Sequence, residues 1–174
     1  MGSLAELLSI SKKSKGNIYL ATLSKKGSIT ETSPGVFHAR AWGERLDENL
    51  MEILIEIAKS QSNHKARLCL HPDPDEKLQV TYLAFTKPYS DKIHKHPNRP
   101  EVVVPLYGLA FHSIFNSKGE LIKKQLLDGT RTVAISTKIN EWHTIELESE
   151  NFVMLEIGIG PFLPNSTIYY AYNR

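Results

Sequence analysis

The fold of this chain is indicated most clearly by the stretch His94-Lys-His96-Pro-Asn-Arg-Pro-Glu101-Val-Val-Val-Pro-Leu-Tyr-Gly108. Side chains two residues apart on a strand point to the same face, so His94 and His96 can converge on one point. The prolines that follow indicate a turn, after which Glu101 begins the next strand near that point. Two imidazoles and a carboxylate suit a divalent Fe, Mn, Ni, Co or Zn ion. The stretch therefore predicts a site for one metal ion.

A fourth ligand is expected further along the chain. His143 lies in Trp142-His143-Thr144, after a turn and before an apolar strand. We expect its imidazole to complete the metal site. The alternative interpretation is a histidine at the end of a strand that only packs against Trp142.

The chain after residue 66 consists of short apolar runs separated by turns. The predicted strands are Leu78–Phe85, Glu101–Tyr107, Leu109–Asn116, Leu121–Leu127, Thr132–Thr137, Thr144–Leu147, Phe152–Ile159 and Thr167–Tyr172. Ser117-Lys-Gly119 and Asp128-Gly129 are typical of hairpins or bulges. Many short strands without intervening helices indicate an all-β sandwich or barrel, and a jelly-roll of about eight strands leaves few exposed edges.

The segment before the barrel has a different pattern. We expect residues 1–65 to form an N-terminal extension that packs on a barrel formed by residues 66–174. Two β-rich stretches, Ile18–Leu23 and Val36–Trp42, precede a predicted helix over residues 46–60. Apolar residues recur in that helix at three- and four-residue spacing and form one stripe. The helix is therefore expected to cover a sheet or an interface.

Composition limits the class of protein. The 174 residues suit one domain, and 21 basic against 19 acidic residues argue against a nucleic-acid binder. No run approaches the ~18 apolar residues of a membrane span, and the N-terminus lacks a secretory pattern, so we expect a cytoplasmic protein. The single cysteine, Cys69, excludes an internal disulfide. We interpret it as a small buried apolar residue rather than a nucleophile or ligand.

From His94 to Gly108 the sequence resembles the first metal motif of the cupin superfamily. That motif has two histidines one residue apart, a glutamate after four more residues and a glycine after a further six. The resemblance implies a jelly-roll barrel whose metal ligands are His94, His96, Glu101 and His143. Of the second cupin motif only the histidine is present, because its proline, glycine and asparagine positions hold Lys138, Asn140 and Leu147.

More closely, the chain resembles the WbuC family of cupin-fold metalloproteins. The likeness extends from about Pro34 to Tyr170 and includes Pro34-Gly-Val-Phe, Arg67-Leu-Cys-Leu-His71-Pro-Asp-Pro-Asp75, Trp142-His143-Thr and Gly160-Pro161-Phe162. This family occurs among bacterial polysaccharide (O-antigen) gene clusters. The resemblance implies a sugar-like ligand and a homodimer formed through the N-terminal strand or helix. Where the family has a lysine before the glutamate, this chain has Arg99 and Pro100.

Four further residues are candidates for the pocket. Arg67 and His71 share a face if they lie on one strand, and an inward arginine demands an anionic partner such as an acidic ligand. Through the resemblance, His71 is a candidate catalytic residue, and otherwise it is a loop histidine. Glu156 lies in an apolar run, so it either faces solvent or pairs inside, where a raised pKa would suit a general acid or base. Tyr82 is a candidate for substrate binding or for the core.

The remaining histidines lack a partner at ligand spacing. The sequence pattern indicates surface positions for His38, His64 and His112.

Three functions are compatible with this pattern. The first is a metal-dependent isomerase or epimerase of a sugar or nucleotide-sugar intermediate in bacterial surface polysaccharide biosynthesis, with Glu156 or His71 moving the proton. The second is an Fe(II)-dependent oxygenase with the same ligands. The third is a non-catalytic module that binds a small carboxylated or hydroxylated molecule. The residues leave open the choice among these functions and the identity of the metal.

Overall fold

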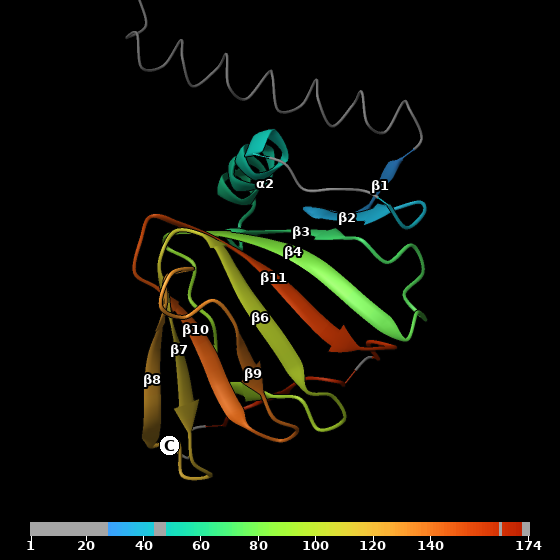
Figure 1. Cartoon of the computed structure of the whole chain (residues 1–174). Helices are drawn as coiled ribbons and strands as arrows, with labels where there is room; N and C mark the ends of the chain where they lie inside the picture. The colour runs from blue at the N-terminus through green and yellow to red at the C-terminus, as the bar shows by residue number, and fades with distance from the viewer. Residues whose placement is uncertain (1–27, 44–47, 164, 172–174) are drawn as a thin grey trace, which may run out of the picture.

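The structure, a computed structural model, describes residues 28–43, 48–163 and 165–171. Within these residues the strands form a seven-stranded and a five-stranded sheet, and a helix lies against the larger sheet (Figure 1). Neighbouring strands run antiparallel, except for one parallel pair in the larger sheet. The all-β jelly-roll predicted from the sequence is confirmed.

The larger sheet begins near the N-terminus and ends at a short strand that precedes His143. Its strands, in spatial order, are β1 (Ile29–Ser33), β2 (Val36–Ala39), β3 (Lys65–Cys69), β4 (Leu78–Thr86), β11 (Asn151–Ile159), β6 (Glu101–Tyr107) and β9 (Ile135–Thr137). Strands β2 and β3 form the parallel pair, with the helix in the connection between them. Strand β11 is central and pairs with β4 on one side and β6 on the other.

The smaller sheet brings together two of the predicted metal ligands. Its strands, in spatial order, are β12 (Ile168–Tyr169), β5 (His94–Lys95), β10 (Trp142–Leu147), β7 (Ala110–Phe115) and β8 (Leu121–Leu127). In the pairing of β5 with β10, His94 lies directly opposite His143. The contact between the His94 segment and the His143 segment is therefore fixed by the register of this sheet.

Helix α2 (Glu48–Ser60) covers the outer face of the larger sheet (Figure 1). Glu48 in its first turn and Lys59 in its last turn match the polarity of the helix dipole. Leu54 is 1% exposed and packs with the residues of β3 and β4 that face the helix. The predicted start at residues 46 and 47 lies outside the described residues. No helix in the described ranges is long and apolar enough to span a membrane.

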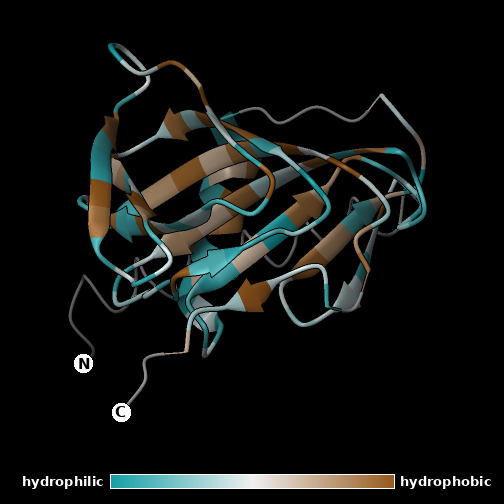
Figure 2. Ribbon diagram, turned by 90° about the horizontal axis from the view of Figure 1, so that it is seen from below, coloured by the Kyte–Doolittle hydropathy of each residue, from teal (hydrophilic) through white to brown (hydrophobic). Residues whose placement is uncertain are grey.

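A second apolar layer lies between the two sheets. Along β4, Leu83 and Phe85 point to this layer, whereas Tyr82 and Ala84 pack on the side of α2. Hydrophobic and hydrophilic residues follow one another along the strands, as the brown and teal bands in Figure 2 show. The larger sheet thus has apolar side chains on both faces, and the polar residues on its inner face stand out as candidates for a site.

Some predicted boundaries differ from those observed. The run Thr132–Thr137 becomes a strand only from Ile135, because Oδ1 of Asp128 accepts hydrogen bonds from the backbone N–H groups of Thr130, Arg131 and Thr132. Strand β1 has no counterpart in the prediction. The predicted strand Ile18–Leu23 lies outside the described residues.

Candidate metal centre and its cavity

A cavity of about 280 Å³ lies between the inner faces of the two sheets. Its wall includes residues from β3, β4, β6 and β11 of the larger sheet and from β5, β7, β10 and β12 of the smaller sheet. Leu83, Phe85 and Ile145 of the apolar layer form part of this wall. The polar side chains in the same wall are described below.

His94, His96 and His143 form one cluster in this cavity, here called the histidine trio. One ligand atom of each residue lies within 4.8 Å of those of the other two. The ring centroid of His94 lies 5.1 Å from that of His96 and 4.4 Å from that of His143. The separation between His96 and His143 is 5.5 Å. These three side chains could hold a metal ion.

The outer nitrogen of each ring in the trio is bound to the backbone. The Nδ1 atoms of His94, His96 and His143 lie 2.8, 3.0 and 2.8 Å from the carbonyl oxygens of Lys92, Ser166 and Glu141. Because a carbonyl oxygen only accepts, each Nδ1 must carry the proton and donate it. In the neutral ring Nε2 is then the atom with the lone pair, which is how proteins orient histidines that bind metals.

Glu101 stands beside the trio. Its Oε1 lies 3.1 Å from Nε2 of His96, and its Oε2 lies 3.7 Å from Nε2 of His143. Burial raises the pKa of Glu101, but the contact with His143 and the electrostatic influence of His96 and Arg99 outweigh it and lower the pKa to about 2. The carboxylate is therefore ionised at neutral pH, as a metal ligand must be.

Arg99 links Glu101 to Glu156. Its Nη2 lies 2.6 Å from Oε1 of each carboxylate, and its Nε donates to Glu101 at 3.1 Å. Arg99 is 5% exposed, and its guanidinium fits against Gly158, where a Cβ atom would lie 3.1 Å from Cζ of the arginine. Of the two alternatives for Glu156, the structure shows the inward, paired one. Burial and the negative charge of Glu101 raise the pKa of Glu156.

The other candidates lie at different places. Arg67 and His71 both line the cavity, on the side of β3. Nδ1 of His71 lies 3.1 Å from both the backbone N and the backbone O of Val80. Tyr82, in contrast, packs against the apolar cluster beneath α2 and is not among the residues that line the cavity.

Sequence reasoning placed two cavity histidines at the surface. His112 is 3% exposed, its ring stacks on that of His143 at 5.7 Å, and its Nε2 lies 3.1 Å from Oγ1 of Thr137. Burial and the neighbouring His143 lower the pKa of His112 to about 4. His38 also lines the cavity. The apolar Ala110 lies two residues before His112 on β7, and this spacing is the sequence signal that could have indicated an inward position.

The comparisons with known proteins concern part of the chain. A family model described as a domain of unknown function (DUF6016) matches residues 46–127. No curated protein has a matching sequence. The chain is similar to CapF in complex with the inhibitor 3-isopropenyl-tropolone, with a TM-score of 0.55 and 13% identity over 75% of this chain and 42% of that one. It is also similar to the capsular polysaccharide assembling protein CapF from Staphylococcus aureus, with a TM-score of 0.52 and 17% identity over 59% and 29%.

These structures establish only the architecture, because the identities are low. The chain also spans less than half the length of either CapF chain. The fold and the histidine trio together define a class of protein. The chain is a cupin-fold protein with a histidine-rich group that could bind a metal ion.

Proposed function

We propose that the chain is a WbuC-type, metal-dependent isomerase or epimerase that acts on a small sugar intermediate of bacterial surface polysaccharide biosynthesis. His94, His96, His143 and Glu101 hold one divalent ion in this proposal. The observation that carries it is the set of three imidazoles whose Nδ1–H groups all donate to carbonyl oxygens, at 2.8 to 3.0 Å. This arrangement prepares three Nε2 lone pairs for one ion before that ion arrives.

The donor set fits such an ion chemically. Three imidazole nitrogens and one carboxylate oxygen suit Fe, Mn, Co, Ni or Zn and leave coordination positions for a ligand. Arg99 contacts Oε1 of Glu101, whereas Oε2 faces His143 at 3.7 Å. Arg99 therefore orients the carboxylate without occupying the oxygen that faces His143.

The size of the cavity limits the ligand. A volume of about 280 Å³ is close to the lower end of ligand pockets, so a single sugar ring fits better than an entire nucleotide sugar. Lys65, Gln79 and Thr81 in the wall offer hydrogen-bonding groups to hydroxyls. The named role of the Staphylococcus aureus CapF in capsular polysaccharide assembly supports this class of ligand.

Glu156 is the proton carrier in this proposal. A divalent ion in this site would polarise a carbonyl or enediolate oxygen of the sugar. Glu156 faces the cavity, and burial and the negative charge of Glu101 raise its pKa, which favours a carboxyl that can both accept and donate a proton. Arg99 positions it through the 2.6 Å contact. We assign proton transfer to Glu156 rather than to His71, whose Nδ1 is held by Val80.

The test is solvent exchange. The full chain, loaded with Mn, Fe, Co, Ni or Zn in parallel, is incubated with keto-sugars and keto-sugar nucleotides in deuterated water. We expect deuterium at the carbon next to the carbonyl in at least one of them. E156Q should lower the exchange rate by roughly 100-fold or more, the usual contribution of a general base. The control is E150Q, because Glu150 is an exposed glutamate.

The same experiment separates the alternatives. Oxygen uptake by the iron-loaded chain, with no exchange, would replace the proposal with an Fe(II)-dependent oxygenase. Ligand binding without exchange or oxygen uptake would indicate a non-catalytic module. If exchange occurs but E156Q matches the wild type, the assignment of Glu156 is wrong and the isomerase stands.

A further inference from the structure

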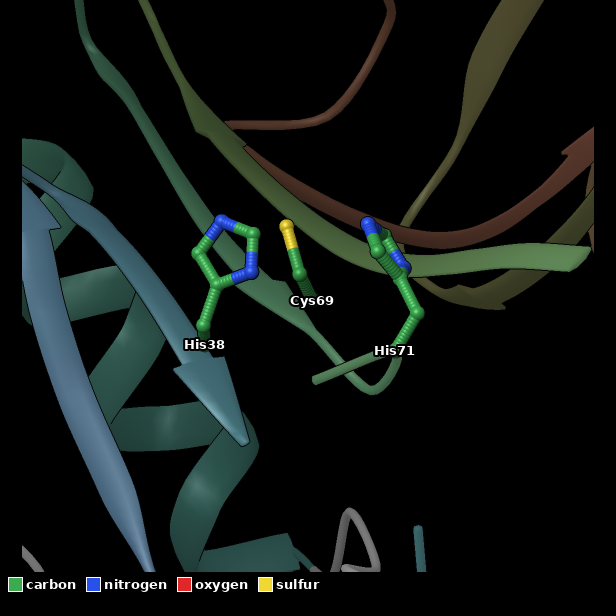
Figure 3. A group of neighbouring side chains, drawn as sticks. All are labelled: His38, Cys69 and His71. Atoms are coloured by element: carbon green, nitrogen blue, oxygen red, sulfur yellow. The ribbon is translucent and has the colours of Figure 1, made fainter. Parts of the chain in front are cut away.

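A second cluster of ligand-type side chains lies on the inner face of the larger sheet. His38 is on β2, Cys69 ends β3 and His71 follows two residues later. The parallel pairing of β2 with β3 puts His38 directly opposite Cys69. Side chains two apart on an extended chain share a face, which aligns His71 with both. Figure 3 shows Cys69 between the two imidazoles, with all three side chains on one side of the ribbon.

The three side chains are close enough to hold one ion. One ligand atom of each lies within 4.8 Å of those of the others, and the rings of His38 and His71 meet edge to face at 5.6 Å. All three residues line the cavity, so a fourth position would open into it. Cys69 is 7% and His71 4% exposed, which shields the donor atoms from bulk water.

One atom of the cluster lacks a partner. Nδ1 of His38 is buried, and within the described residues no hydrogen bond satisfies it. Figure 3 shows one nitrogen of this ring on the side of Cys69. Buried polar atoms of native proteins nearly always have a partner. An ion between the three side chains would supply one.

The other two donors are held from behind. The hydroxyl of Thr81 donates to Sγ of Cys69 at 3.9 Å. Nδ1 of His71 lies 3.1 Å from both the backbone N and the backbone O of Val80, so the backbone of that residue fixes the imidazole ring. Outer partners of this kind fix the ligands of metal sites.

The donor types select the ion. Two imidazoles and a thiolate are a set typical of Zn²⁺, and three protein ligands with one open position are the pattern of zinc sites that bind a further molecule. The thiolate also distinguishes this set from the histidine trio, whose neighbour is a carboxylate.

From this geometry we infer that His38, Cys69 and His71 form a second metal site, for Zn²⁺, whose fourth position faces the cavity. The inference concerns different residues from those of the proposed function and does not depend on it. Both sites open into one cavity, so a ligand of the first site lies within the same enclosure as the second ion.

The experiment uses Co²⁺ as the probe. Metal-free full chain is titrated with Co²⁺ and followed by absorption. A thiolate bound to Co²⁺ gives an intense charge-transfer band in the near ultraviolet, which nitrogen and oxygen ligands do not give. Cys69 is the only cysteine in the chain, so the band reports this site alone. We expect the band in the wild type and in H94A. In C69S we expect no band, although one equivalent of Co²⁺ still binds at the histidine trio.

Zinc bound to the unmodified protein gives a readout that does not depend on the folding of a variant. X-ray absorption at the zinc edge should show a sulfur scatterer at about 2.3 Å. Absence of both the cobalt band and the sulfur scatterer at saturating metal would overturn the inference. So would a band that survives in a folded C69S, as judged by circular dichroism. If H94A binds as many equivalents of Co²⁺ as the wild type, that result would instead count against the metal site of the proposed function and leave the second site unaffected.

Discussion

The two clusters in the cavity differ in how the sequence assembles them. His94 and His96 are neighbours on one short segment, and only His143 has to arrive from elsewhere, through the pairing of β5 with β10. In the second cluster, His38 meets Cys69 only because α2 connects two strands that then run parallel. Local spacing reveals a site of the first kind, whereas a site of the second kind exists only once the topology is known.

The clusters also differ in their electrostatic surroundings. The histidine trio stands beside Glu101, and Arg99 joins that carboxylate to Glu156. The outer partners of Cys69 and His71 are a neutral hydroxyl and the backbone of Val80. Substitutions in the charged network should therefore lower the free energy of unfolding strongly. Substitutions around the second cluster should mainly lower its affinity for a metal ion.

Replacement of Arg99 should have the largest effect. R99M leaves Glu101 and Glu156 without their cation, and removing one partner of a buried ion pair costs about 3–5 kcal/mol. We expect the free energy of unfolding at pH 7, measured in urea, to fall by this amount. Because Arg99 also orients Glu101, metal affinity of the trio should fall, while the cobalt–thiolate band of the second cluster stays.

The control for R99M is R40M. Arg40 is exposed and its Nε donates to Oγ1 of Thr30 on an outer strand. We expect a change within about 0.5 kcal/mol, as is usual for surface sites. Equal losses in the two variants would mean that the Arg99 network is no more desolvated than the surface.

Replacement of Thr81 should have an intermediate effect, confined to the second cluster. T81V keeps the shape of the side chain but removes the hydroxyl that donates to Sγ of Cys69. Loss of an outer partner costs roughly 10- to 100-fold in metal affinity, and we expect the lower value because the sulfur contact is long. Competition between the protein and a chelator for Co²⁺, followed at the thiolate band, measures it.

The matched control is T32V, since the hydroxyl of Thr32 donates to the carbonyl of Val36 at the exposed edge. Unchanged affinity in T32V and a fall in T81V would support the second site. A fall in affinity at the trio as well would show that the two clusters are coupled, which would break the comparison.

Much of the fold could be predicted because it depends on the alternation of apolar runs with turns along the chain. Strands such as Glu101–Tyr107 and Leu121–Leu127 have the predicted limits, since apolar runs end at turns with glycine or asparagine. Strand β1 could not be predicted: its sequence, ITETS, is largely polar, and only pairing with β2 fixes it. Gly35, with φ +73°, makes the turn between them.

The site is harder to predict than the fold, because burial is a property of the assembled sheets. His112 has no local partner, and its contact with His143 arises from the pairing of β7 with β10. Arg99 occupies a turn, where an arginine is usually solvated, and only the space at Gly158 brings it inside. The positions of the trio follow from spacing, whereas the residues around it follow from packing.

Lys65 permits the smallest test. It lines the cavity on β3, and burial, with the nearby Arg67, lowers the pKa of its amine to about 8. The ordinary value is 10.5, so between about pH 8 and 10.5 the unfolded chain binds more protons than the folded one. Unfolding free energy from this group therefore rises with pH across that window.

The comparison of wild type with K65M isolates the amine. Burial raises the pKa of Cys69, so its thiol lowers stability as pH rises, and it does so in both proteins. Because only the wild type gains stability from Lys65 as pH rises, the difference in unfolding free energy between K65M and wild type should narrow from pH 7.5 to pH 10. We expect a narrowing of about 1 kcal/mol, a reduced value because water in the cavity screens the charge. Urea titrations at both pH values measure it. A constant gap would show that the amine is solvated, and that the wall near the second cluster is as wet as the surface.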